Sequence, residues 1–424
     1  MEAASDVMSS QRRPSRGRQV ETARRAKRPA SQKARRIERV FFVGAGFSVP
    51  LGYPSGGLLP KRLIEYLGGQ AGPSIKNSLA SYAPEEKRSE LLRTIQSFLR
   101  YFFNTTLEGV STVDVGEFYT LAHSLADMPT LFPFPPKERT AISTLFQDLA
   151  IVTRTYFYDI FKAFTMPPDS ARLLESLDPN ADAIVSLNWD EELDIFLCDQ
   201  DFLDREVAYT LRSWSNATHR EPTYLLLKPH GSVGWYTNTQ NLGNKNLYLV
   251  AERDDRIPNR SLVAYEHPEL PRDLANRRRW TGLEYPPVIT APTFAKRFQY
   301  PEQLQIWRDV LEICAGAREF VFLGYSLPPD DYLTRAAIIS AQRRSHGVKC
   351  VVVTQGVGDS LLRSLRSAFG AELDGRNFLG WSFGSGDESL PDALDDQLRR
   401  SPVLLRDSDD RRWGKADRER RLRR

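Results

Sequence analysis

Glycines and polar residues follow directly on apolar runs at several points of this chain. Glycines let backbone N–H groups approach a bulky anion closely, and an asparagine amide both donates and accepts hydrogen bonds. A histidine can take up a proton near neutral pH. These residue types together suit a site that binds a phosphate compound and moves a proton. The segments concerned are 44–48, 188–190, 229–232, 291–293, 324–331 and 354–356.

The first of these segments reads GAGFS and comes at the end of the run RVFFV. We expect its backbone N–H groups and the hydroxyl of Ser48 to bind a pyrophosphate. The usual dinucleotide fingerprint has a third glycine, where this chain has Val49, and an acidic residue about 20 residues later. The chain shows neither feature clearly. A tight turn without a ligand is therefore the alternative interpretation.

Each of the other segments also has a structural interpretation when it is taken alone. Asn188 can serve a turn, and Asp190 can cap the helix predicted at 191–199. His230 precedes a glycine, as an ordinary turn histidine does, and Ser326 can lie near a helix start. What favours a functional site is that these segments all stand at the ends of predicted strands.

The apolar runs that precede these segments predict the strands of an α/β fold. Several runs are apolar without alternation, as in strands that are buried on both faces of a parallel sheet. Amphipathic stretches such as 191–199 and 303–317 lie between them and predict helices. We therefore expect a Rossmann-like open, mostly parallel sheet, in which ligands bind beyond the carboxyl ends of the strands. The predicted strands are 39–43, 182–187, 224–228, 287–290, 319–323 and 348–353.

A long helical stretch separates the first two predicted strands. Residues 86–103 and 138–164 carry helical periodicity, which predicts a helical insertion over about 58–170. We expect this insertion to cover one side of the mouth of the sheet. The domain as a whole is predicted to span 39–404, with a helix and a final strand in 360–404.

The two ends of the chain are predicted to be basic tails. Residues 1–38 lack hydrophobic periodicity and predict a disordered arm, and residues 405–424 predict a charged tail. Residues 1–40 carry a net charge of +8 and residues 405–424 carry +4, which leaves −8 for 41–404. A basic nucleic-acid-binding core is therefore excluded, although the arm itself could contact nucleic acid. The alternatives for the arm are a solvated tail or a start codon assigned too early, with Met8 as a later start.

The composition predicts a metal-free protein of a reducing compartment. With 424 residues, of which 41% are hydrophobic and 26% charged, the chain fits a globular protein of one large domain or two ordinary ones. Three distant cysteines exclude a disulfide framework and a four-cysteine zinc site, and the five histidines show no metal-ligand spacing. No apolar run is long enough to span a bilayer. We therefore expect a cytoplasmic location without membrane attachment.

Four motifs in this order resemble those of the sirtuin family. The resemblance spans about residues 39–385, and its order and context are most similar to a bacterial branch without the zinc ribbon, whose members often act in antiphage defence as NAD hydrolases. The combination is specific, although no single motif is. The motifs are GAGFSVPLGYP, with Gly44, Ala45, Gly46, Ser48, Gly52 and Pro54; LNWD, with Asn188 and Asp190; KPHGSVGW, with His230 and Gly231; and GYSLPPDD, with Gly324 and Ser326.

Three departures from the deacylase sirtuins narrow what the resemblance implies. Those enzymes continue the first motif with Asp-Phe-Arg, where residues 55–57 of this chain read Ser-Gly-Gly, and they carry a four-cysteine zinc ribbon. They also have a late asparagine that contacts a ribose, where this chain has Thr354 and Gln355. Their acyl-lysine groove lies between two modules, so the missing zinc module argues against a peptide substrate. NAD binding is compatible with all three departures.

The resemblance implies an NAD hydrolase that releases nicotinamide and ADP-ribose, or a cyclic product, without a metal. It implies catalytic roles for three residues: Asn188 orients a water or the ribose hydroxyls, His230 takes a proton, and Asp190 supports the loop or orients Asn188. The residues implied in NAD binding are Gly44, Ala45, Gly46, Phe47, Ser48, Pro54, Gly324, Ser326 and Thr354.

The sequence leaves other functions open. The chain could be a protein deacylase or an ADP-ribosyltransferase, or a silent module that senses NAD or ADP-ribose. It could also be a nucleic-acid-binding adaptor that works through residues 1–38. For the hydrolase, the resemblance implies activation by self-assembly into a homo-oligomer or by a protein partner, such as a helicase-like ATPase or an Argonaute-like protein.

Overall fold

The computed structural model of the chain forms one compact unit over Arg35–Arg424. It describes residues 36–70, 75, 77–79, 83–128, 134–163, 165–204, 209–216, 223–237, 247–249, 262–265, 287–290, 301–328, 330–344, 347–370, 373–387 and 389–404. The two predicted tails lie outside the described residues, apart from 36–38. The predicted segment 291–293 lies outside them as well, and the domain limits 39–404 stay a prediction.

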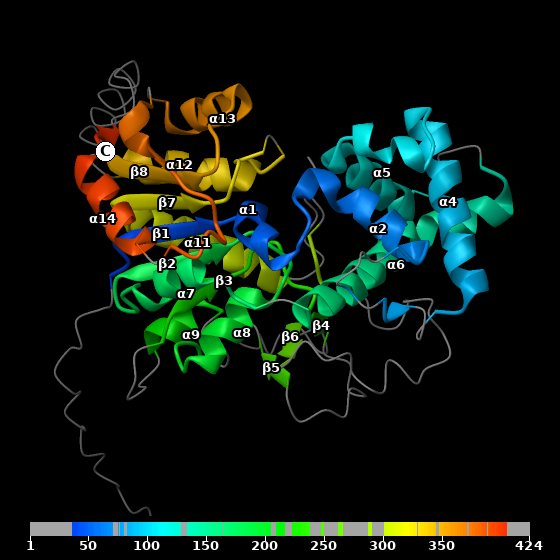
Figure 1. The fold of residues 1–424 in the computed structure, drawn as a ribbon, viewed down its shortest axis with the longest axis horizontal. Coiled ribbons are helices and arrows are strands. Elements are labelled where there is room, and N and C mark those ends of the chain that lie inside the picture. Colours follow the sequence, from blue (N-terminus) through cyan, green and yellow to red (C-terminus); the bar gives the residue numbers. More distant parts are fainter. Residues whose placement is uncertain are drawn as a thin grey trace, which may run out of the picture. The chain divides into compact units, whose positions relative to one another are not determined.

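A seven-stranded sheet forms the centre of this unit, in the order β10-β8-β7-β1-β2-β3, with β9 paired to β8 (Figure 1). All its strand pairs are parallel except β10 with β8, which is antiparallel. The predicted open, mostly parallel α/β sheet is therefore confirmed. The strands are β1 (Arg39–Val43), β2 (Asp182–Ser186), β3 (Leu225–Leu227), β7 (Glu319–Leu323), β8 (Val348–Thr354), β9 (Phe378–Gly380) and β10 (Val403–Leu404).

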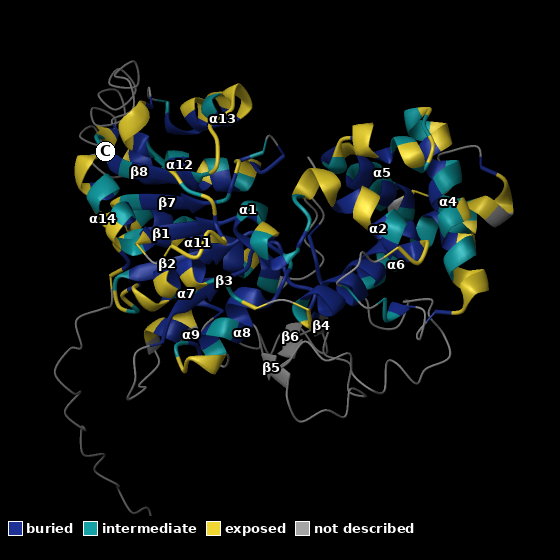
Figure 2. Cartoon of the chain, viewed as in Figure 1, coloured by how far each residue is buried: buried dark blue, intermediate teal, exposed yellow. Residues whose placement is uncertain are grey.

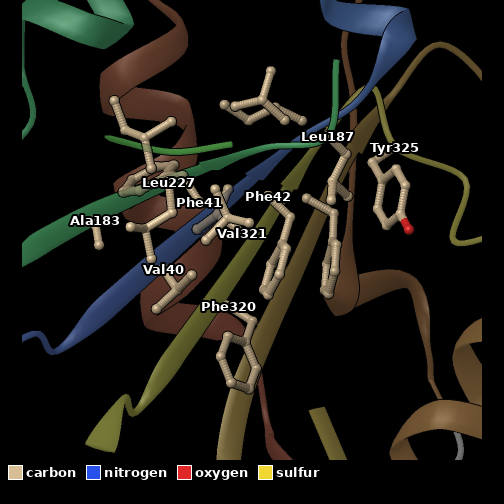
Figure 3. Packing of buried hydrophobic residues seen from close by; sticks show 14 of the residues in the cluster. Val40, Phe41, Phe42, Ala183, Leu187, Leu227, Phe320, Val321 and Tyr325 are labelled. Atoms are coloured by element: carbon tan, nitrogen blue, oxygen red, sulfur yellow. The ribbon is translucent and has the colours of Figure 1, made fainter. Parts of the chain in front are cut away.

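The strands of the sheet centre are buried along almost their whole length, as their continuous apolar sequences predict (Figure 2). Figure 3 shows Phe41 and Phe42 of β1 among side chains from β2, β3 and β7. The ring of Phe42 stacks on Phe322 of β7, with the ring centroids 5.1 Å apart. This packing fixes the strand ends from which the candidate functional residues emerge.

Helices lie between the strands along the chain, as expected for an α/β fold. α11 packs on α12 and α12 on α13, while α14 packs on α7. These helices are α7 (Pro168–Glu175), α8 (Glu192–Asp199), α9 (Leu211–Asn216), α11 (Pro301–Gly316), α12 (Tyr332–Arg344), α13 (Asp359–Phe369) and α14 (Leu390–Arg400).

A set of helices separates β1 from β2, where we predicted a helical insertion. Its hydrophobic cluster joins residues of α4, α5 and α6 to Val233 and Ile289, which lie in loops beyond the sheet. The insertion therefore packs against the loops at the carboxyl ends of the strands. Its elements are α1 (Ala45–Ser48), η1 (Val49–Leu51), η2 (Gly56–Leu58), α2 (Leu59–Leu67), α4 (Glu85–Phe103), η3 (Glu108–Thr112), α5 (Val115–Asp127) and α6 (Pro136–Phe161).

Three features differ from the sequence-based prediction. Residues 287–290 do not form a sheet strand, because Ile289 makes only an isolated antiparallel bridge with Gly231. A small antiparallel sheet of β4 (Trp235–Thr237), β6 (Leu262–Tyr265) and β5 (Leu247–Leu249), in that order, was not predicted. The last element of the domain is not β9 but the short β10, which follows α14. Within the described residues, every helix is too short or too polar to cross a membrane.

Candidate functional site

A cavity of about 480 Å³ lies beyond the carboxyl ends of β1, β2, β3 and β7. It opens where the strand order changes direction, since β2 and β3 follow on one side of β1 and β7 and β8 on the other. This is the position at which open α/β sheets bind ligands. Of the residues implied by the sequence motifs, the cavity is lined by Gly44, Ala45, Gly46, Ser48, Pro54, Asn188, Asp190, His230, Gly324 and Ser326.

Two of the implied residues do not border this cavity, as the described residues form it. Phe47 is buried and packs edge-on against Phe383, with ring centroids 5.2 Å apart. Thr354 ends β8 and donates its hydroxyl to the carbonyl of Gly356 at 3.1 Å. Both side chains therefore serve local packing or turn geometry in this structure.

The glycines at the end of β1 let the loops after β1 and β7 pack closely. A Cβ on Gly46 would lie 2.8 Å from the carbonyl oxygen of Gly324, and a Cβ on Gly324 would lie 2.3 Å from the nitrogen of Phe47. A Cβ on Gly44 would lie 2.7 Å from atoms of Tyr325. The missing side chains are thus filled by protein, and the two loops form one wall of the cavity.

Two backbone N–H groups that we predicted to bind a pyrophosphate are bonded within the protein. The N–H of Gly44 donates to the carbonyl of Leu323 at 3.0 Å, and that of Gly46 donates to the carbonyl of Gly324 at 2.8 Å. These bonds continue the pairing of β1 with β7 past the strand ends. They hold the shape of the wall instead of facing the cavity.

Ser48, Asn188 and Asp190 form a buried hydrogen-bonded row along one side of the cavity. Nδ2 of Asn188 donates to the carbonyl of Gly44 and to Oγ of Ser48, both at 3.0 Å. The Ser48 hydroxyl in turn donates to Oδ2 of Asp190 at 2.9 Å. The serine proton and the asparagine amide nitrogen are therefore engaged with protein. The carbonyl oxygen of the Asn188 side chain is left as the atom that can orient a ligand.

His230 follows β3 at a turn that depends on the next residue. Gly231 has a φ of +76°, and a Cβ there would lie 2.0 Å from the carbonyl oxygen of Val288. The turn places Nδ1 of His230 3.2 Å from the carbonyl oxygen of Leu187, at the end of β2. Nε2 lies 2.9 Å from Oδ1 of Asp331. The second contact has the distance of an ion pair without the alignment of a regular hydrogen bond.

Asp331 and Tyr325 are residues of this site that we did not predict, although both lie in the GYSLPPDD motif. Both line the cavity and both are buried. The Tyr325 hydroxyl donates to Oδ2 of Asp331. Burial, together with the Asp331 charge, raises the pKa of Tyr325 well above its ordinary value, so the phenol keeps its proton. The run of acids at the end of this motif was the feature of the sequence that could have pointed to them.

A cluster of buried acids surrounds a buried lysine behind the cavity. Asp190, Glu191, Glu192 and Asp194 are all buried at the start of α8. Lys228, at the end of β3, donates from Nζ to the backbone oxygen of Asp190 at 2.5 Å, to Oδ2 of Asp194 at 2.7 Å and to Oγ of Ser232 at 3.0 Å. The lysine therefore ties the loop that carries Asn188 and Asp190 to the end of β3.

Tyr53 connects this cluster with the cavity. Its ring lines the cavity, and its hydroxyl donates to Oε1 of Glu192 at 2.7 Å. Burial raises the pKa of Glu192 to about 8, and the charges of Asp190 and Glu191 add to this while the Tyr53 hydrogen bond opposes it. Glu192 is therefore protonated at neutral pH in the folded protein.

Glu192→Gln should stabilise the protein more as the pH rises. The pKa of Glu192 is about 8 when folded, against an ordinary 4.5, so between these values the folded state keeps a proton that the unfolded state has lost. Wild-type stability therefore falls as the pH rises through this range, and it gains nothing back above it. Urea unfolding should show no difference near pH 4 and a gain on the order of a few kcal/mol above pH 8.

The matched control for this pH series is Glu85→Gln, because Glu85 is exposed in the first turn of α4. Its effect should stay within about 0.5 kcal/mol at every pH. A gain from Glu192→Gln that did not change with pH would contradict the raised pKa of Glu192.

The cavity has an acidic and aromatic lining. Asp190, Asp330 and Asp331 border it, and no lysine or arginine is among the described residues that line it. Tyr53, Phe157 and Trp189 supply aromatic surface. Such a lining favours a ligand group, or a transition state, that carries positive charge. In the described part of the chain, no group of three or more histidine, cysteine, aspartate or glutamate side chains is arranged to hold a metal ion.

Comparisons with known proteins give similarity at the level of the fold. No protein-family model matches the chain, and no curated protein matches it. A Sir2 homologue solved in complex with NAD is 11% identical, with 85% of this chain and 90% of that chain covered and a TM-score of 0.36. A mutant of a Sir2 homologue in complex with ADP-ribose gives 11%, 85%, 93% and 0.36, and Sir2Tm bound to a propionylated peptide gives 15%, 76%, 83% and 0.26, in the same order. The chain is thus distantly similar in fold to Sir2 structures.

Proposed function

We propose that this protein is an NAD hydrolase that cleaves the bond between nicotinamide and ribose. The observation that carries the proposal is that Asn188 and His230, from the ends of β2 and β3, line one cavity together with three carboxyl side chains. The sequence motifs that resemble sirtuins meet at this cavity. Its volume of about 480 Å³ lies within the range of small-molecule sites, about 300–1,000 Å³.

The charge of the lining suits this reaction. The nicotinamide of NAD is cationic and leaves as a neutral molecule, taking the electron pair of the broken C–N bond with it. The ribose carbon then carries positive charge, as in glycoside hydrolysis. Asp190, Asp330 and Asp331 would stabilise this developing charge, since opposite charges attract more strongly in a buried site.

The two polar residues would complete the hydrolysis. The side-chain carbonyl of Asn188 would orient a water toward the ribose carbon, because its amide nitrogen is already anchored on Gly44 and Ser48. The water oxygen forms the new bond to the ribose, and its proton passes to His230. The balanced reaction consumes NAD and water and yields nicotinamide, ADP-ribose and one proton.

The proposal extends to the biological setting that the motif resemblance implies. In that setting the chain depletes NAD as an effector of antiphage defence. Self-assembly or a protein partner, such as a helicase-like ATPase or an Argonaute-like protein, would then switch the activity on.

The direct test is product release from NAD by the purified full chain, followed by chromatography of nicotinamide and ADP-ribose. The wild type should release both in equal amounts. Asn188→Ala should lower the rate by about 100-fold or more, because a mispositioned nucleophile costs that much. Asn180→Ala, at an exposed asparagine before β2, is the matched control and should keep the wild-type rate.

Two outcomes would contradict the proposal. Equal release by the wild type and Asn188→Ala would remove Asn188 from the reaction. Calorimetric NAD binding by a wild type that releases no nicotinamide, in the presence of candidate activators, would favour a sensor of NAD or ADP-ribose instead.

A further inference from the structure

Both ring nitrogens of His230 already have oxygen neighbours in the protein. Nδ1 lies 3.2 Å from the backbone carbonyl of Leu187. A carbonyl oxygen can only accept, so Nδ1 is the nitrogen that carries a proton in the neutral ring. Nε2 is then the nitrogen that can take up a further proton, and it lies 2.9 Å from a carboxylate oxygen of Asp331.

We infer that Asp331 is the positioning residue of His230, an inference that rests on the proposed hydrolase. In this arrangement Oδ1 of Asp331 shares the proton that Nε2 takes up, so the two side chains act as one proton-accepting pair. Their side chains are only 10% and 3% exposed. A proton on the pair gives a neutral combination of imidazolium and carboxylate, which is cheaper to bury than a lone imidazolium.

The arrangement differs from the usual triad, in which the carboxylate binds Nδ1 and leaves Nε2 to the substrate. Here a backbone carbonyl takes Nδ1 and the carboxylate lies on Nε2. The proton released by the attacking water therefore moves to a nitrogen that Asp331 already faces. The new C–O bond forms, the C–N bond breaks toward nicotinamide, and the pair keeps the proton until solvent removes it.

Asp331 is itself held in place from several sides. Its backbone N–H donates to the carbonyl of Pro328 at 3.0 Å, and its carbonyl accepts from the N–H of Arg335 in α12 at 3.2 Å. Its second carboxylate oxygen accepts from the Tyr325 hydroxyl. The Tyr325 side chain in turn occupies the space that a Cβ on Gly44 would fill. A connected row of contacts thus runs from the first glycine of the GAG segment to His230.

The kinetic test uses Asp331→Asn, which keeps the size of the side chain and an acceptor for Tyr325. We expect kcat for nicotinamide release to fall about 100-fold, within the range for loss of a residue that orients a histidine. KM for NAD should stay within twofold, because Asp331 acts through His230 and not through substrate binding. Asp359→Asn, at an exposed residue of α13, is the matched control and should change neither constant.

A second background separates positioning from a merely structural role. In His230→Ala, the further change Asp331→Asn should lower kcat less than twofold, since the pair is already broken. Equal losses in both backgrounds would overturn the inference, and so would a loss confined to KM. Tyr325→Phe removes the hydroxyl that holds Asp331 and should give an intermediate loss.

A measurement without NAD keeps the inference independent of the proposed activity. In the full chain labelled with ¹⁵N-histidine, the signals of His230 are assigned by comparison with His230→Ala. At neutral pH the Nε2 resonance should have protonated character in the wild type and move strongly downfield in Asp331→Asn, while Nδ1 stays protonated. An unchanged Nε2 resonance would overturn the pairing. If the resonance moves but the wild type releases no nicotinamide, the hydrolase fails and the pairing stands.

Discussion

His230→Ala is expected to lower kcat for nicotinamide release by about 1,000-fold, within the range for loss of a general base. The side chain stands where a proton acceptor is needed, since it lines the cavity beside Asn188. Alanine removes the acceptor and leaves Asp331 without its partner. Nicotinamide can leave without help because it is already cationic, so a residual rate should remain. Steady-state kinetics with NAD would measure the loss.

The shape of the result distinguishes a proton acceptor from a packing residue. ADP-ribose should bind to His230→Ala by calorimetry within a few-fold of the wild type, and added imidazole should restore part of kcat. His123→Ala is the matched control, because His123 packs on Phe146 in the helical insertion and does not line the cavity. A His230→Ala enzyme with wild-type kcat would remove His230 from the reaction.

The sheet could be predicted from sequence because its central strands are continuous apolar runs. β1, β2, β7 and β8 begin and end within one residue of the predicted runs. The run at 287–290 looked similar, but it lies against the His230 turn, where the N–H of Thr290 donates to the His230 carbonyl. Its first residue, Pro287, has no N–H to donate to a ladder. β10 has two residues, too few to produce a pattern.

The site could be predicted in part, for a different physical reason. In a parallel sheet all strands end at one edge, so residues that follow strands, such as Asn188 and His230, meet there. Sequence spacing does not show which atom faces which, however. The space at Gly44 is filled by Tyr325, and the Ser48 hydroxyl is used by Asp190. These partners come from distant parts of the chain, and only tertiary packing determines them.

Lys228→Met is expected to lower the free energy of unfolding by about 3–5 kcal/mol, the usual cost of removing one partner of a buried ion pair. Lys228 is fully buried, and its three hydrogen bonds reach Asp190, Asp194 and Ser232. The burial of Asp190 raises its pKa, and the charge of Lys228 is the first factor that lowers it again. Methionine fills the space but leaves the carboxylate of Asp194 without this cation. Urea unfolding would measure the change.

A double variant shows whether charge or packing causes this loss. Lys228→Met combined with Asp194→Asn removes both charges, so it should be more stable than Lys228→Met alone, even though Tyr209 also donates to Asp194 at 2.5 Å. Lys61→Met, at a lysine that is 46% exposed, should change stability by less than about 0.5 kcal/mol. If the double variant were as unstable as the single one, the loss would come from packing. Because Lys228 also holds the backbone oxygen of Asp190, Lys228→Met should slow nicotinamide release as well, which would tie the buried charge to the position of Asn188.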